Sequence, residues 1–155
     1  MLLDPASVAT LGGGIALAGG LAGSAIGIAI AASAGAATLS QDRTQLRNVI
    51  ILAALPMSRA FYGIIILLIV LTTVVPKLTT VPDGFVVLSC AVIAAFSFGV
   101  SGACQGYVCA SGISFLPKTK GKILANSIML AVFVELLAVL GLVFTIMSLT
   151  MLGVM

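Results

Sequence analysis

The sequence predicts an all-α membrane protein whose four transmembrane helices form two tandem hairpins in a parallel repeat. Hydrophobic residues make up 61% of the 155-residue chain and charged residues only 7%. The mean hydropathy is +1.34. A soluble domain of this length could not bury so much apolar surface, so the chain is expected to lie in a bilayer. Four long apolar stretches predict the four helices, and an internal repeat predicts their arrangement as two hairpins.

The first apolar stretch, residues 7–39, and the third, residues 85–116, are expected to be packing helices. Each carries a small residue at about every fourth position, which lets helix backbones approach closely in a membrane. These positions are Gly19, Gly23, Gly27, Ala31 and Gly35 in the first stretch and Gly102, Gly106, Ala110 and Ser114 in the third. The stripes fit ordinary pairing inside one monomer, but two of them in one short chain favour a crowded inner wall around an axis.

The second stretch, residues 48–75, and the fourth, residues 123–152, are long enough to cross the hydrocarbon core. Short connections join the four spans, and Pro76, Pro82 and Pro117 are expected to mark span ends.

The basic residues of the connections predict the orientation of the chain. Arg43 and Arg47 follow the first span, and Lys118, Lys120 and Lys122 follow the third. The connection on the opposite side carries only Lys77. The positive-inside rule then places the two basic loops in the cytoplasm and both termini outside. We expect a multi-pass protein of a prokaryotic cell membrane, with no cleaved signal peptide, because a basic n-region is missing at the start.

A shift of 78 residues aligns the chain with itself, pairing Asn48 with Asn126 and Gly63 with Gly141. We therefore divide the chain into a first helical hairpin, residues 1–78, and a second, residues 79–155. Each unit contains two spans, so both copies point the same way.

Glu135 is the only acid inside an apolar span, because Asp4, Asp42 and Asp83 lie at ends or in connections. An ionisable group at the centre of a membrane helix is disfavoured by about 2.5–3.5 kcal/mol and by default marks an ion path, proton relay or ligand site. Gln105 in the third span is either a hydrogen-bonding contact between helices or a ligand.

The second span carries a polar face of its own. Leu55, Ser58 and Arg59 are spaced i, i+3, i+4 and so share one side of a helix. Pro56 precedes the last two and is expected to open the helix locally. A mid-membrane arginine needs a partner or access to water. Together with Gln105 and the acid of the fourth span, this face is expected to form a polar pocket.

The absence of His excludes catalysis and metal sites that depend on imidazole. Cys90, Cys104 and Cys109 lie in apolar runs and are expected to be small buried residues rather than disulfide or metal ligands. The pI near 9.0 reflects topology-determining lysines and arginines, not nucleic-acid binding.

A resemblance to a known family covers essentially the whole chain. It rests on residues 54–63, 102–113 and 133–141 and on the glycine-rich first span. The chain resembles the proteolipid (c or K) subunit of V-type and A-type rotary ATPases in its four-helix, doubled form. The resemblance implies a homo-oligomeric rotor ring in lipid, with the first and third helices as inner wall. It implies a stator subunit of the a or I type with an essential arginine, and a central-stalk subunit at the cytoplasmic loops. Such a subunit translocates H⁺ or Na⁺, is no enzyme alone and needs no cofactor.

The same resemblance implies that Glu135 is the ion-binding carboxylate. In sodium-carrying members, a Leu carbonyl, a Thr hydroxyl, two Gln side chains and the Glu surround the ion. Leu55, Ser58, Gln105 and Glu135 match or conservatively replace four of these, which gives a possible Na⁺ site. Arg59 stands where the other Gln would be. Beside the acid, its guanidinium would hold the carboxylate ionised and repel a cation; alternatively it turns toward the ring interior or water.

Two other functions remain open at this point. A small multidrug-type exporter could use Glu135 to bind cationic substrates or protons, although such exporters usually carry the acid in the first helix beside aromatic residues. A structural pore or fusion proteolipid would give Glu135 no transport role.

Overall fold

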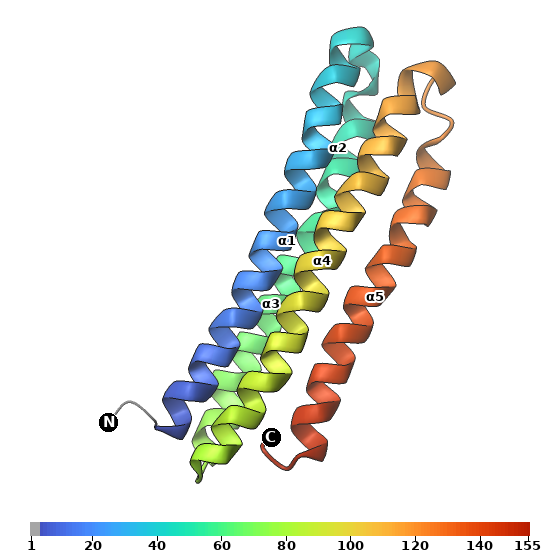
Figure 1. The fold of residues 1–155 in the computed structure, drawn as a ribbon. Coiled ribbons are helices and arrows are strands. Elements are labelled where there is room, and N and C mark those ends of the chain that lie inside the picture. The colour runs from blue at the N-terminus through green and yellow to red at the C-terminus, as the bar shows by residue number, and fades with distance from the viewer. Residues whose placement is uncertain (1–3) are drawn as a thin grey trace.

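A computed structural model describes residues 4–155 as a bundle of long, nearly parallel or antiparallel helices (Figure 1). The α-helices are α1 (Pro5–Gln41), α2 (Leu46–Ala54), α3 (Ser58–Ile69), α4 (Val81–Thr119) and α5 (Leu124–Met151). Short helical turns continue or join them: η1 (Arg43–Gln45), η2 (Leu55–Met57), η3 (Val70–Val74) and η4 (Val75–Lys77). The segment from Arg43 to Lys77 acts as one span, which gives four helices long and apolar enough to cross a membrane. The predicted all-α fold with four membrane helices is confirmed.

The helices extend a few residues further into the connections than the sequence predicts, and α4 contains a proline near each of its ends. Pro82 lies in the first turn of α4, where its missing N–H is tolerated. Pro117 lies inside α4 and cannot donate to the carbonyl of Ile113 one turn earlier. The Thr38 hydroxyl of α1 donates to that carbonyl at 3.1 Å and so replaces the lost backbone bond. Pro82 thus marks the start of α4 as predicted, and Pro117 lies two residues before its end rather than at it.

α4 instead ends two residues later at a left-handed turn. Lys120 has φ 51° and Gly121 has φ 81°, a conformation that glycine adopts without strain. The Gly121 N–H donates to the Leu116 carbonyl at 3.0 Å. This turn reverses the chain into α5.

α1 and α4 pack against each other along their length and form the inner pair of the bundle. A Cβ atom on Gly106 would lie 2.5 Å from Gly27 Cα, and one on Gly102 would lie 2.6 Å from the Gly23 carbonyl carbon. A Cβ on Gly19 would similarly meet the Ala95 backbone. The glycine stripes thus bring two helices of one chain into backbone contact. Gly35 differs, since its space is limited by the Val49 side chain of α2.

The remaining helices flank this inner pair: α3 lies mainly against α1, and α5 lies mainly against α4 (Figure 1). The three cysteines are free thiols, and Cys90 and Cys109 are buried as expected. Cys104 is exposed instead, because it lies on the outward side of α4.

The second span bends at Pro56, where one tight 3₁₀ turn, η2, separates α2 from α3. The buried hydroxyl of Ser24 on α1 donates to the Pro56 carbonyl at 2.8 Å and accepts from the Ala60 N–H at 3.0 Å. One side chain of α1 thereby satisfies backbone groups on both sides of the break. This contact fixes the direction in which the first turn of α3 presents its side chains.

Candidate functional site

An ion pair between α3 and α5 lies in the middle of the bundle. Glu135 Oε2 on α5 accepts a hydrogen bond from Arg59 Nη1 on α3. The Arg59 side chain is fully buried and the Glu135 side chain is 22% exposed. Within residues 4–155 this is the one salt bridge that the structure contains. Of the two arrangements that the sequence left open for Arg59, the structure therefore shows pairing with the acid.

The Arg59 guanidinium is surrounded by oxygen atoms from three helices. Nη1 donates to Ser58 Oγ at 2.8 Å and to Gln105 Oε1 at 2.7 Å, in addition to Glu135. Nε donates to Ser101 Oγ on α4 at 3.4 Å. Nη2 is buried and has no hydrogen-bond partner among the residues described. Charge-assisted bonds of this kind are about twice as strong as neutral ones, so they stabilise a cation in the bundle interior.

Both oxygens of the Glu135 carboxylate accept further hydrogen bonds. Gln105 Nε2 donates to Oε2 at 3.0 Å and also to the Ala131 carbonyl of α5 at 3.0 Å. Because Gln105 is fully buried and bonded at both ends of its amide, its orientation is fixed. The Tyr62 hydroxyl donates to Oε1 at 2.7 Å.

Tyr62 and Ser101 are site residues that the sequence reasoning missed. Tyr62 follows Arg59 by three positions and Ser58 by four, so helical spacing already places it on the same face of α3. Its ring packs on Phe98 of α4, with the ring centroids 5.9 Å apart. Ser101 precedes Gln105 by four positions on α4, and the same spacing could have identified it.

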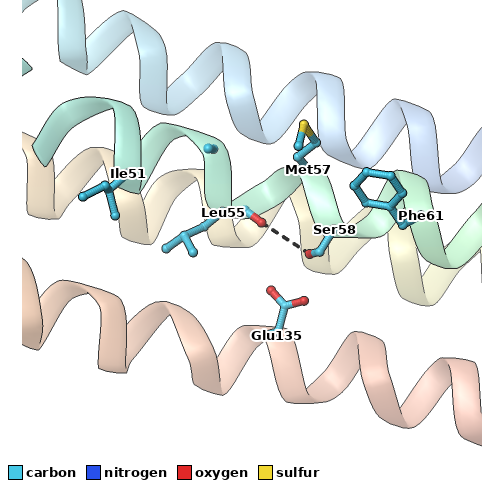
Figure 2. A pocket seen from close by; sticks show the side chains of 7 residues that line it. Ile51, Leu55, Met57, Ser58, Phe61 and Glu135 are labelled. Atoms are coloured by element: carbon cyan, nitrogen blue, oxygen red, sulfur yellow. Dashed lines mark hydrogen bonds between the residues drawn. The ribbon is translucent and has the colours of Figure 1, made fainter. Parts of the chain in front are cut away.

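Ser58 and Leu55 lie at the edge of the site that faces a cavity. The Ser58 hydroxyl donates to the Leu55 carbonyl at 3.3 Å, as a helical serine often does. Figure 2 shows both residues on one side of the cavity and the Glu135 carboxylate directed toward them from α5. The cavity volume is about 400 Å³, and its other lining residues are Ile51, Ala54, Met57 and Phe61. All five residues predicted for the site thus lie within one region between α3, α4 and α5.

The chemistry available here is exchange of charge on one carboxylate. In the part of the chain that is described, no three His, Cys, Asp or Glu side chains gather as metal ligands. Glu135 is held by a tyrosine, an amide and a guanidinium, and it borders a cavity with mainly apolar walls. The ionised acid is compensated by Arg59, and the same carboxylate can also be neutralised by protonation and ionised again.

Comparison with known proteins gives an independent assignment. The family model that describes the C subunit of ATP synthase matches the chain twice, over residues 11–70 and 88–148. The two matches start 77 and end 78 residues apart, in agreement with the repeat seen in the sequence. The chain is also 34% identical over 139 residues to the A-type ATP synthase subunit K of Methanocaldococcus jannaschii. That alignment covers 87% of this chain and 60% of the length of the relative. The chain belongs to the ATP synthase C-subunit family.

Proposed function

We propose that this protein is the rotor-ring subunit of an A/V-type rotary ATPase. In this proposal, copies of the chain form a ring in the membrane, and each copy carries a monovalent cation on Glu135. The observation that supports it most directly is the partly buried, hydrogen-bonded carboxylate of α5 in a chain of the C-subunit family. The name of the M. jannaschii relative points to the same class of complex.

Transport would depend on the charge of this site. A charged site facing lipid is strongly disfavoured. Arg59 compensates the ionised carboxylate, so loading a cation on Glu135 would change the net charge of the pair from neutral to positive. A stator subunit with an arginine would favour release of the ion where the site meets water. The central stalk would contact the basic loops on the cytoplasmic side, and rotation would couple ion flow to ATP hydrolysis or synthesis elsewhere. The chain itself would be no enzyme.

The orientation follows the same proposal. Arg43 and Arg47 lie in and just after the connection between α1 and α2, and Lys118 and Lys120 lie at the end of α4. In Figure 1 these two connections lie at the same end of the bundle, opposite both termini. Placing that end in the cytoplasm satisfies the positive-inside rule.

A carbodiimide, which reacts with protonated carboxyl groups in apolar sites, tests the role of Glu135. In membranes containing the whole complex, labelling is expected at Glu135 and is expected to stop ATP hydrolysis coupled to ion transport. Glu135→Gln should remove both the label and the transport. Asp83→Asn is the matched control, because Asp83 lies in the first turn of α4, where it accepts from the Thr80 N–H. Transport that persists in Glu135→Gln complexes would refute the proposal, and a purified particle the size of a dimer would favour the exporter.

A further inference from the structure

The position of Arg59 Nη1 has the geometry of a cation-binding position. Three oxygens converge on that nitrogen: Ser58 Oγ from α3, Gln105 Oε1 from α4 and Glu135 Oε2 from α5. Hydroxyl, amide and carboxylate oxygens are the ligands that hard cations take. The Leu55 carbonyl lies next to this set through its bond from Ser58. A metal ion bound by these groups would have to occupy the space that the guanidinium fills.

Arg59 has no ready way to leave this position. The side chain is fully buried, and its Nε and Nη1 donate hydrogen bonds to four acceptor oxygens on three helices. A guanidinium is always charged in proteins, so it cannot become neutral to admit a second cation. The charge is therefore a permanent part of the site.

We propose that Arg59 Nη1 is a tethered cation in the place of an alkali-metal ion, so the site exchanges protons and rejects sodium. This inference rests on the proposed rotor function and specifies its transported ion. Two unit charges about 4 Å apart repel enough, at an effective dielectric constant of about 20, to weaken sodium binding roughly 10³-fold. Loss of the oxygen ligands to the guanidinium weakens it further.

A proton avoids the steric part of this conflict, because it needs one oxygen rather than a set of ligands. A hydronium ion gives up a proton and leaves as water, an O–H bond forms on Glu135 Oε1, and the carboxylate becomes a neutral acid. The Tyr62 hydroxyl, which donates to that oxygen in the structure, can rotate and accept from the new O–H instead. After protonation Arg59 keeps its bonds to Ser58, Gln105 and Ser101 but loses its anionic partner, so the pair carries a net positive charge until the proton leaves.

The test measures the rate at which a carbodiimide labels Glu135 in the assembled complex, at fixed pH and with choline replacing sodium to hold ionic strength. Bound sodium displaces the proton from the acid and slows labelling. We expect sodium to have no effect on the wild-type rate. In Arg59→Gln, the guanidinium is replaced by an amide whose oxygen can bind a cation. Sodium binding should then be roughly 10³-fold stronger than in wild type, so sodium should slow labelling of this variant. Arg59→Lys keeps the charge and should stay insensitive.

Three outcomes overturn the inference: sodium slows wild-type labelling, sodium leaves Arg59→Gln labelling unchanged, or Arg59→Lys responds as Arg59→Gln does. The wild-type measurement decides even if Arg59→Gln fails to assemble. Failure of the rotor function would look different. In that case the effect of sodium on the labelling rate of Glu135 could still be measured. However, the label would not block ATP-coupled transport, or the purified particle would not be a ring.

Discussion

Neutralising Glu135 alone is expected to destabilise the protein more than neutralising both members of its ion pair. In Glu135→Gln the Arg59 guanidinium stays fully buried and loses its anionic partner. In the double variant Arg59→Gln/Glu135→Gln neither charge of the pair remains. Removing one partner of a buried pair commonly destabilises by about 3–5 kcal/mol, whereas replacing both with neutral groups is often close to neutral.

The structure places Glu135→Gln at the lower end of that range, near about 3 kcal/mol. Ser58, Gln105 and Ser101 still accept from the guanidinium, and the Glu135 side chain is already 22% exposed. The double variant should lie within about 1 kcal/mol of wild type, because two neutral amides can hydrogen-bond to each other. The coupling energy of the pair is then about 2 kcal/mol or more, well above the value for independent sites.

The detergent-solubilised chain is unfolded by titration with a denaturing detergent, and circular dichroism follows the loss of helix. This gives the free energies of unfolding of wild type, the two single variants and the double variant, which complete the double-mutant cycle. Arg47→Gln is the matched control, because Arg47 is an exposed arginine on the same span. It should change the free energy of unfolding by less than about 0.5 kcal/mol. Additive effects of Arg59→Gln and Glu135→Gln, within about 0.5 kcal/mol, would show that the pair does not stabilise the fold as argued.

Gly106→Ala should weaken the contact between α1 and α4, because its Cβ would lie 2.5 Å from Gly27 Cα; Gly14→Ala, with nothing within 4 Å, should be neutral or stabilising in the same unfolding assay. Ser24→Ala should destabilise by about 1–3 kcal/mol, since the buried Pro56 carbonyl loses its donor; an unchanged free energy of unfolding would contradict the role given to that hydroxyl. At Asp42, a hydrogen bond from the Thr44 hydroxyl is the main cause that lowers the pKa below 3.8, followed by one from Gln45. The turn should therefore be fully stabilised above pH 3.8 and loosen as the pH falls through the lowered pKa, with faster Thr44 amide exchange as the readout.

The sequence was sufficient to predict the four spans. It also singled out Glu135 as a candidate site residue, because a lone acid in an apolar helix is unfavourable there. It also placed Leu55, Ser58 and Arg59 on one face from helical spacing alone. It did not decide where Arg59 points. That direction depends on acceptors from other helices, Ser101 and Gln105 of α4 and Glu135 of α5, whose positions local spacing does not give.

Helix ends were harder to predict for a related reason. Pro117 normally predicts the end of a helix, since it leaves a carbonyl without a donor. The donor comes from Thr38, a residue far away in the chain, so no local pattern could indicate it. Cys104 was expected to be buried from its apolar neighbours, but helix rotation, which the composition does not fix, leaves it on the outer side of α4.

The two halves of this chain have become dependent on each other. The arginine belongs to the first family match and the glutamate to the second, so each half on its own would hold one unmatched charge deep in the bilayer. Once fused, the pair would resist any later split of the gene, and it would penalise a ring assembled from copies of one half only.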